Sequence, residues 1–474
     1  MAEDNVDICV IGGGSGGLSV AAGAAQMGAK VALFEGAAMG GDCLNHGCVP
    51  SKVLLAAAKT AATIRQASDF GLDASLHTVD RAAVRDRVKA VIAAIAPHDS
   101  VPRFEGLGVR VIQAYGRFTE RMTVAGGGVE IKARRVVIAT GSQPLVPPIP
   151  GLSDVDYLTN ETIFDLDQTP RHLIILGGGP IGIEMAQAHR RLGSAVTVLE
   201  MATIMPKDDP VLVALLRSRL QAEGINLKEA TTATAVHRTV DGAVTVRVES
   251  AGQVQEITGS HLLVAAGRRP NIDNLDLDTA GIAFDRGGIS VDRGLKTSNR
   301  RVYAIGDVAG PYQFTHLAGY HAGIVIRNAL FRLPARVKYA AFPWVTYTDP
   351  ELAQVGLNAT AAAERYADAR ILEWSFDEND RAQTEGKTAG MVRVMTRGNG
   401  RILGASILGP SAGELIQPWT LALSKGLKIG AIATAIAAYP TLSDINRAVA
   451  GGFYTPRLFG PGTHRLVRWL AKFG

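Results

Sequence analysis

Short apolar stretches alternate along the chain with longer segments of helical periodicity. Residues 7–35 start with an apolar strand, pass through a glycine-rich turn into a helix of small residues, and end on a second apolar strand closed by Glu35. Residues 172–200 repeat this order and close on Glu200. Strands that alternate with helices are typical of a parallel sheet, so the pattern predicts an α/β fold with two related units.

Glycines occupy equivalent places in the two turns. Both turns have the spacing GxGxxG, in which the first glycine allows a tight turn, the second lets a pyrophosphate approach, and the third lets helix and strand pack closely. The helix start then presents free N–H groups to the phosphates. The order of elements argues against a merely flexible loop and predicts two dinucleotide-binding, Rossmann-like units. The glycines are Gly12, Gly14 and Gly17 in the first turn and Gly177, Gly179 and Gly182 in the second.

The acid that closes each unit bears on the choice of nucleotide. Glu35 is placed to accept the hydroxyls of an adenosine ribose. Glu200 would do the same in the second unit and would repel a 2′-phosphate, and residues 201–205 contain no basic side chain. NAD(H) is therefore favoured over NADP(H). A phosphate contact by Arg190 or Arg191, at the end of the nearby helix, stays open as the alternative.

Three further apolar strands break into glycine turns, in residues 134–144, 262–271 and 301–310. Taken singly, each is an ordinary connection between a strand and a loop. Beside the two fingerprints, these turns are expected to line the nucleotides, and an aspartate after the third strand suits a hydrogen bond to a sugar or ribityl hydroxyl. The residues concerned are Thr140, Gly141, Gly267, Gly306 and Asp307.

Composition shifts divide the chain into domains. The proline-rich residues 144–151 and the loop at 268–281 bracket the second unit, which is therefore predicted to be inserted into the first. After about residue 345, strand-like segments are followed by helices, which indicates an α+β domain. The predicted domains are residues 1–150 with 273–345, residues 151–272, and residues 346–474.

Charge and cysteine content narrow the class of protein. The 474-residue chain has a net charge of +5, and its Lys and Arg residues are spread along it, so nucleic-acid binding is not indicated. Three cysteines are too few for the disulfide framework of a secreted protein. The sequence shows neither an export signal nor a membrane-spanning run, so a cytoplasmic location is expected.

Cys43 and Cys48 precede a segment of helical pattern that has Pro50 in its first turn. The positive end of a helix and the nearby Lys52 both favour thiolate, so the pair is predicted to be a redox-active dithiol. Zinc is disfavoured because the spacing is C-x4-C and no second cysteine pair exists, and no metal site is expected. Two inert core cysteines are disfavoured because the residues around them are polar.

Together these motifs resemble the class I pyridine nucleotide-disulfide oxidoreductases, the flavoprotein family of dihydrolipoamide dehydrogenase, glutathione reductase and mercuric reductase. The resemblance covers nearly the whole chain, through GGGSGG with Glu35, CLNHGCVPSK, ATGS, GGGPIG with Glu200, AAGRRPN, AIGDV and GASILGPSAGELIQ. It implies FAD in the first domain, with Gly41 among its contacts, NAD(P)H in the second, and a homodimer built on the third.

The resemblance also implies residue roles. Cys48 would face the flavin, Cys43 would be the interchange thiol that meets substrate, and Lys52 would pair with Glu184 at the flavin N5. Electrons would pass from nicotinamide to flavin, then to the disulfide, and then to an external acceptor. Without the resemblance, Glu184 is simply a helix residue after Gly182.

One motif departs from the family. Dihydrolipoamide dehydrogenases and glutathione reductases carry a His-Pro-Thr motif and a following Glu as an acid-base pair from the partner subunit, and Tyr439 and Asp444 stand at these positions here. A phenol with a pKa of about 10 is a poor base at neutral pH, so slow oxidation of dihydrolipoamide is expected. Tyr439 could instead donate a proton, line a substrate pocket or simply pack before Pro440. His46 is a candidate replacement base, or else a solvated side chain.

The expected function is therefore an FAD-dependent enzyme that passes electrons from NADH to a small-molecule or protein disulfide, or to a similar acceptor. A dihydrolipoamide dehydrogenase, a mercuric reductase-like metal reductase and a redox sensor with little turnover are the alternatives. Mercuric reductases carry a second cysteine pair near the C-terminus, and this chain has no cysteine after Cys48, so the metal reductase is disfavoured. His316 and His321 are expected to pack near the flavin.

The C-terminal residues 455–474 alternate basic and apolar side chains in a short amphipathic pattern. Such a helix could contact a membrane surface or a protein partner. Packing on the chain's own dimer is the alternative.

Overall fold

Alternate side chains of the first predicted strand point to opposite faces of one large sheet. The computed structural model describes residues 4–310 and 312–473. The strand β1 lies between β2 and β6 and runs parallel to both, while β3 pairs with β2 and β18 pairs with β6, also in parallel. The hairpin of β4 and β5 extends β6 in antiparallel fashion. The bounds are β1 (Asp4–Ile11), β2 (Val31–Phe34), β3 (Val109–Ile112), β4 (Arg117–Glu120), β5 (Thr123–Gly126), β6 (Val129–Ile138) and β18 (Val302–Ala304).

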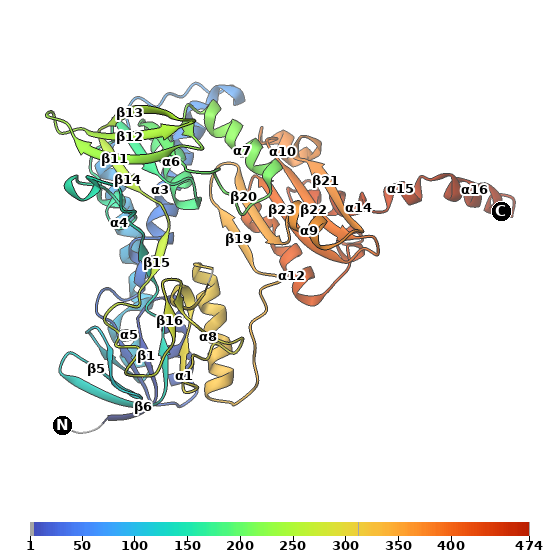
Figure 1. Ribbon diagram of the computed structural model, residues 1–474. Coiled ribbons are helices and arrows are strands. Elements are labelled where there is room, and N and C mark those ends of the chain that lie inside the picture. The colour runs from blue at the N-terminus through green and yellow to red at the C-terminus, as the bar shows by residue number, and fades with distance from the viewer. Residues whose placement is uncertain (1–3, 311, 474) are drawn as a thin grey trace. The chain divides into compact units, whose positions relative to one another are not determined.

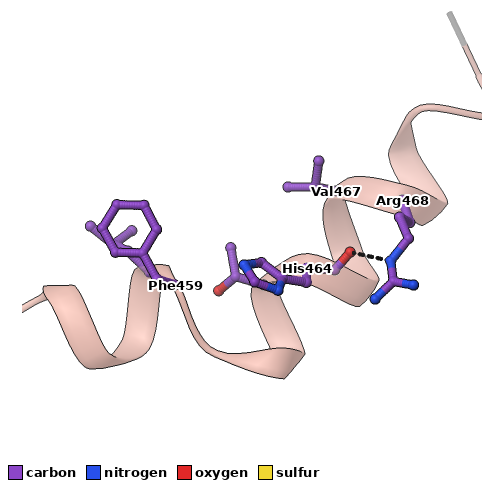
Figure 2. A pocket seen from close by; sticks show the side chains of 6 residues that line it. Phe459, His464, Val467 and Arg468 are labelled. Carbon is purple, nitrogen blue, oxygen red and sulfur yellow. Dashed lines mark hydrogen bonds between the residues drawn. The ribbon is translucent and has the colours of Figure 1, made fainter.

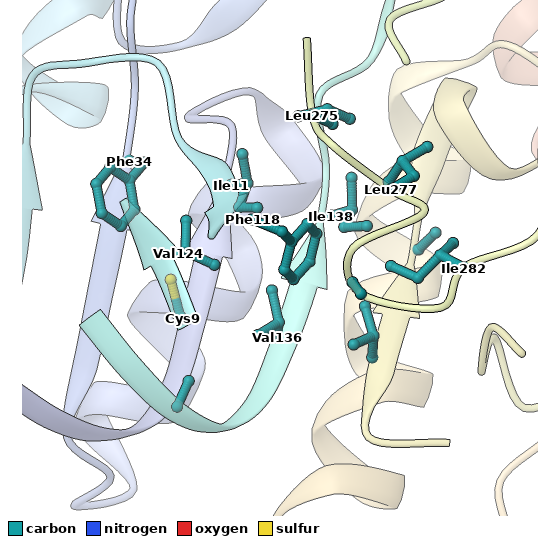
Figure 3. Close-up of a cluster of buried hydrophobic side chains, with 14 of the residues drawn as sticks. Cys9, Ile11, Phe34, Phe118, Val124, Val136, Ile138, Leu275, Leu277 and Ile282 are labelled. Carbon is teal, nitrogen blue, oxygen red and sulfur yellow. The ribbon is translucent and has the colours of Figure 1, made fainter. Parts of the chain in front are cut away.

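Both faces of this sheet are buried, as the nearly continuous apolar runs of its strands predict. Cys9, Ile11 and Phe34 belong to the core on one face, which Figure 3 shows. On the other face the helices α1 (Ser15–Gln26) and α8 (Thr315–Ala329) pack against each other and against the sheet. The glycine turns after β1 and β18 therefore lie at the carboxyl ends of two parallel strands that flank β6.

The second predicted unit forms its own sheet. The strand β8 lies between β9 and β14 and runs parallel to both, and α6 packs against β8 and β9. A three-stranded antiparallel sheet follows, in the order β11-β12-β13. The bounds are β8 (His172–Leu176), α6 (Pro180–Arg191), β9 (Ala195–Leu199), β11 (Thr232–Arg238), β12 (Val244–Ser250), β13 (Gln253–Gly259) and β14 (His261–Val264).

The C-terminal part is built on a five-stranded antiparallel sheet in the order β19-β20-β23-β22-β21. Helices α12 and α14 cover a core in which Trp419 is fully buried and its indole N–H donates to Asn446 Oδ1 at 2.8 Å. Figure 1 shows α15 and α16 extending away from this sheet. The bounds are β19 (Pro343–Thr346), β20 (Glu351–Gly356), β21 (Ala369–Ser375), β22 (Met391–Arg397), β23 (Ile402–Gly409), α12 (Gln417–Lys425), α14 (Asp444–Gly451), α15 (Thr455–Leu458) and α16 (Pro461–Leu470).

The chain divides into two compact units. One takes in the chain up to Ala202 together with Lys228–Val337, and the other takes in Thr203–Leu227 and the chain from Lys338 onward. The second unit includes α7 (Pro210–Ala222), where the buried Asp209 forms an ion pair with Arg393 of the five-stranded sheet. The three predicted domain ranges stay a prediction.

None of the helices formed by residues 4–310 and 312–473 is both long enough and apolar enough to cross a lipid bilayer.

Candidate active site

The two glycine turns are built in the same way. Gly12 has φ +107°, and a Cβ there would lie 2.4 Å from Ala139 O, while at Gly177 the corresponding values are φ +113° and 2.4 Å from Ala265 O. A Cβ on Gly17 would lie 1.9 Å from Gly12 O, so the third glycine is required for the helix to approach the strand. The same contact at Gly182 is 2.0 Å, from Gly177 O.

The middle glycine of each turn leaves space in front of the helix start. A Cβ on Gly14 would have only Gly41 Cα near it, at 3.8 Å, and a Cβ on Gly179 would have nothing within 4 Å. Gly14 and Gly179 are the N-caps of α1 and α6, and no side chain caps either helix. Backbone N–H groups at both helix starts can therefore receive phosphate oxygens, which fits two dinucleotides.

Each of the two terminal acids accepts one hydrogen bond from a backbone N–H of its glycine turn and one from the N–H two residues after the acid. Glu35 accepts from Gly13 N at 2.5 Å and from Ala37 N at 2.6 Å. Glu200 accepts from Gly178 N at 2.7 Å and from Ala202 N at 2.9 Å. Each carboxylate keeps acceptor capacity for ribose hydroxyls, as the sequence predicts.

The alternative phosphate contacts at the end of α6 are engaged elsewhere. Arg190 Nη1 donates to Ser194 O at 3.3 Å, and the side chain of Arg191 is buried. Arg190 therefore contacts the backbone of the loop that follows its own helix, and the role of Glu200 toward a ribose stays a prediction.

The three other glycine turns come together with the first unit. Thr140 Oγ1 donates to Asn271 O at 2.7 Å, and Asn271 N donates to Gly141 O at 3.0 Å. The short strand β15 (Arg268–Pro270), directly after Gly267, pairs with β7 (Ser142–Pro144). Asp307 Oδ2 accepts from Ser142 Oγ at 2.6 Å. The sequence predicts these turns as a group, and the structure places them side by side.

Burial governs the titration of the groups at the last turn. Burial raises the pKa of Asp307, and hydrogen bonding by Ser142 together with the charge of Arg268 opposes the increase. His321 is fully buried, which lowers its pKa to about 4, and its Nδ1 accepts from Gly306 N at 3.2 Å. A neutral His321 therefore holds the glycine turn in place, which agrees with the expected packing role.

The cysteine pair joins two helices, α2 (Gly41–Asn45) and α3 (Cys48–Arg65). Cys43 is half-buried, Cys48 is exposed, and both are free thiols. A hydrogen bond from Cys43 lowers the pKa of Cys48 to about 6, with help from Thr315 and Lys52 and against burial and the charge of Asp42. The same hydrogen bond raises the pKa of Cys43. In the dithiol form, Cys48 is therefore the thiolate and Cys43 keeps its proton.

A lysine and a glutamate predicted to pair do so. Lys52 Nζ on α3 lies 2.9 Å from Glu184 Oε2 on α6, and the Glu184 side chain is buried. The partner carboxylate fixes the ammonium on the same helix that carries Cys48. A positive charge at this place favours negative charge on a nearby thiolate or ligand.

Several contacts of the redox helices have no sequence signal. Cys48 Sγ lies 3.2 Å from Thr315 Oγ1 at the start of α8. Asp42 pairs with Arg268 at 3.2 Å and accepts from Asn160 Nδ2 at 3.0 Å. Arg268 and its partner Ser142 lie in glycine-turn motifs, and Thr315 directly precedes His316, which is expected near the flavin. Asn160 lies in a segment with no motif signal. His46 is exposed and contributes its backbone oxygen to Asn160.

Tyr439 has an unexpected partner. Its hydroxyl donates to Asp380 Oδ2 at 3.0 Å, whereas Asp444 accepts from Arg447 Nε at 2.9 Å. The hydrogen bond to Asp380 raises the pKa of Tyr439, and the charge of Asp444 adds to the increase. The residue is 73% exposed, so within one chain it is not a packed side chain before Pro440. A phenol held in this way stays protonated at neutral pH and is therefore unsuited to accept a proton.

Metal binding would require several ligating side chains to lie close together. Across residues 4–310 and 312–473, no three His, Cys, Asp or Glu side chains gather in a way that could hold a metal ion.

Comparisons with known proteins cover almost the whole chain. The family model for pyridine nucleotide-disulphide oxidoreductases matches residues 6–322, and the model for the dimerisation domain of these proteins matches residues 342–449. A mercuric reductase of Streptomyces lividans is 34% identical over 461 residues, which is 96% of this chain and 97% of that protein. A dihydrolipoyl dehydrogenase of Thermus scotoductus is 36% identical over 458 residues, which is 92% of this chain and 95% of that protein.

A solved structure extends the likeness to three dimensions. The HOCl-induced flavoprotein disulfide reductase RclA from Escherichia coli superposes with a TM-score of 0.83 at 27% identity. The superposition covers 94% of this chain and 99% of that one.

Proposed function

The chain belongs to the pyridine nucleotide-disulphide oxidoreductase family, and we propose that it passes electrons from NADH through FAD to the Cys43–Cys48 disulfide. The reduced cysteine pair would then pass these electrons to an external disulfide or similar acceptor. Membership confirms the predicted α/β fold with two nucleotide-binding domains and a dimerisation domain, the FAD and NAD(P)H cofactors, and the homodimer. The asymmetry of the cysteine pair is the observation that carries the residue roles.

The glycine turns and acids fit these cofactors. The first turn with Gly41, Thr140, Gly141, Gly306 and Asp307 would hold FAD, which supplies the transfer of electrons between nicotinamide and thiols. The second turn would hold the nicotinamide nucleotide. The Glu200 carboxylate, fixed by two backbone N–H groups, supports NADH over NADPH, because a 2′-phosphate beside it would be repelled.

The thiol step follows from the two pKa directions. Cys43 attacks one sulfur of the acceptor disulfide and gives its proton to the sulfur that leaves, which forms a mixed disulfide and releases the first acceptor thiol. The Cys48 thiolate then attacks Cys43 Sγ, which forms the Cys43–Cys48 disulfide and releases the second acceptor thiol. Two electrons leave the dithiol and reduce the acceptor. Lys52, held by Glu184, would stabilise negative charge beside Cys48.

Tyr439 would act on this step from the partner subunit of the dimer. Held by Asp380, it can return a proton to a leaving thiolate, but it is a weak acceptor for the proton of a substrate thiol. Oxidation of a dihydrolipoamide-type dithiol by NAD⁺ needs such an acceptor, because the substrate thiol must lose its proton to attack the Cys43–Cys48 disulfide. We therefore propose that the enzyme works in the reductive direction and that dihydrolipoamide oxidation is slow.

The test compares initial rates in both directions. Purified wild type and Tyr439→His would be assayed for NADH-driven reduction of lipoamide and for NAD⁺-driven oxidation of dihydrolipoamide. Restoring an imidazole should raise the oxidation rate about 10²-fold, because its pKa suits a general base. Tyr454→His is the matched control, since Tyr454 packs with Phe453 in the same domain and should change neither rate. A wild type already fast at oxidation would contradict the proposal.

We propose two further features, the compartment of the protein and a contact made by its C-terminal tail. The three free cysteines suit a reducing compartment such as the cytoplasm. The C-terminal tail, residues 455–473, would make a contact outside the dimer, with a membrane surface or with a protein.

A further inference from the structure

The C-terminal tail exposes its large apolar side chains. No residue of α15 or α16 is buried. Leu466, Val467, Trp469 and Leu470 of α16 are each more than half exposed, and Phe459 and Phe473 beside it are exposed by 71% and 73%. Exposed apolar groups gathered on one segment are typical of a binding surface.

The exposed side chains are sorted by the helix period. At about 100° per residue, the apolar residues from Leu466 to Phe473 occupy one arc of about 160°. The basic residues Arg465, Arg468 and Lys472 occupy the opposite arc. In Figure 2, Phe459 and Val467 point to the upper side of the two helices, while Arg468 turns away and its Nε donates to His464 O at 3.3 Å. The tail is therefore an amphipathic helix with one apolar and one cationic face.

The tail also carries most of the net charge of the protein. The chain has 49 Lys and Arg residues against 44 Asp and Glu residues. Five of the basic residues and none of the acidic ones follow Asp444, so the first 444 residues carry no net charge. Four of those five lie in the tail, namely Arg457, Arg465, Arg468 and Lys472. An occupant of this surface is therefore expected to be anionic.

A second copy of this chain does not meet that requirement. Two tails are both cationic and repel each other, and the rest of the chain has no net negative charge to offer. The family match to the dimerisation domain ends at residue 449, before the tail begins. A second copy of this chain therefore offers the tail no net anionic charge, and the matched dimerisation domain does not include the tail.

We propose that this tail binds the surface of an anionic lipid bilayer, with α16 lying in the plane of the interface. Leu466, Trp469, Leu470 and Phe473 would enter the boundary between headgroups and acyl chains, and the basic face would contact lipid phosphates. Trp469, in edge contact with Phe473 at 5.0 Å between ring centroids, is a side chain that favours this depth. A homodimer carries two tails, which raises the affinity of the whole. The surface is separate from the thiol chemistry and does not depend on it.

The test is co-sedimentation of the FAD-loaded enzyme with sucrose-filled vesicles. Vesicles of phosphatidylcholine alone are compared with vesicles that also contain phosphatidylglycerol, at low and at high salt. Wild type should pellet only with the anionic vesicles, and less at high salt. The triple variant Arg465→Gln, Arg468→Gln, Lys472→Gln should bind about 10²-fold more weakly, because each basic residue contributes about a fivefold factor near such a surface.

Two matched variants keep the test specific. Arg87→Gln, Arg286→Gln, Lys425→Gln removes the same charge from exposed positions elsewhere and should pellet like wild type. Leu466→Ser, Leu470→Ser leaves the charges in place and should also lose binding. NADH turnover and dimer mass are measured in solution for every variant and should match wild type.

Each contrary result has a definite meaning. Equal pelleting of wild type and the tail variants would overturn the proposal, as would equal pelleting with neutral vesicles. Loss of the dimer in the tail variants without any vesicle binding would show that the tail belongs to the dimer interface. Absence of vesicle binding with an intact dimer would overturn the proposal of a lipid partner and leave an acidic protein as the candidate. A wild type that pellets as expected but reduces no acceptor would contradict the proposed function alone.

Discussion

Cys48 and Cys43 differ in ionisation because the hydrogen bond between them lowers the pKa of Cys48 and raises the pKa of Cys43. Cys48 receives this hydrogen bond from Cys43 and lies 3.2 Å from the hydroxyl of Thr315, and Lys52 adds a positive charge. Cys43 is the donor and keeps its proton. The nucleophile for acceptors is therefore the sulfur that carries the proton, and this proton can pass to the leaving sulfur of the acceptor.

Thr315→Val should raise the pKa of Cys48 by about one unit, because a hydrogen bond to a charged sulfur is lost. The thiolate is present above its pKa of about 6 in the wild type, so the variant should lose thiolate at a higher pH. The pH profile of iodoacetamide alkylation of the reduced enzyme measures this shift. Thr315→Ser keeps the hydroxyl and should follow the wild-type profile, as should Thr60→Val on the exposed side of α3. An unchanged profile in Thr315→Val would assign the low pKa to Cys43 and Lys52 instead.

The strand–turn–helix element occurs twice in the fold. In both copies, the first glycine turns the chain against a neighbouring strand and the third lets the helix touch that turn. In both, a glutamate at the end of the next strand accepts one hydrogen bond from an N–H of the turn and one from the N–H two residues after the glutamate. Two copies of one element can therefore be disabled separately, and each should remove a different cofactor.

Gly17→Ala and Gly182→Ala should have distinct effects. A methyl group at Gly17 would meet Gly12 O at 1.9 Å, so the first turn should open and the purified protein should lose its flavin absorbance. Gly182→Ala meets Gly177 O at 2.0 Å and should keep the flavin but no longer be reduced by NADH. Gly106→Ala is the control, because a Cβ there meets nothing within 4 Å. Flavin retained in Gly17→Ala, or normal NADH reduction in Gly182→Ala, would contradict these assignments.

At the scale of the whole molecule, the proposed reaction needs two chains. Tyr439 and Asp380 form an exposed hydrogen-bonded pair in the C-terminal unit, and the family forms homodimers through its dimerisation domain. If Tyr439 serves the cysteines of the partner subunit, each complete site is shared between the two subunits.

Heterodimers test this sharing. Chains carrying Cys43→Ser and chains carrying Tyr439→Phe, each inactive or strongly impaired as homodimers in disulfide reduction, would be co-expressed with different tags. A shared site predicts that the purified heterodimer recovers about half of the wild-type rate, because one of its two sites is intact. If the site lay within one chain, both subunits would be defective and no rate would return. A Tyr439→Phe homodimer as fast as wild type would remove Tyr439 from the reaction.

The sequence alone predicted the two nucleotide-binding elements and the redox pair, and the family resemblance marked the departure at Tyr439. The signals for the elements and the pair are local properties, namely the strand and helix periods, the glycine spacing and a cysteine pair before a helix. They can be recognised in sequence because they depend on backbone interactions that span only a few residues. The pairing of Lys52 with Glu184 came from the family resemblance, and the domain ranges stay a prediction.

Only the tertiary structure decided which distant groups meet. Thr315 follows Cys48 by 267 residues, and Asp380 precedes Tyr439 by 59. Arg268 reaches Asp42 because β15 pairs with β7. Such contacts depend on how separate elements pack, and no local period or motif in the sequence records them. The amphipathic tail was visible in sequence, but the exposure of its apolar face was settled by the absence of buried residues in α15 and α16.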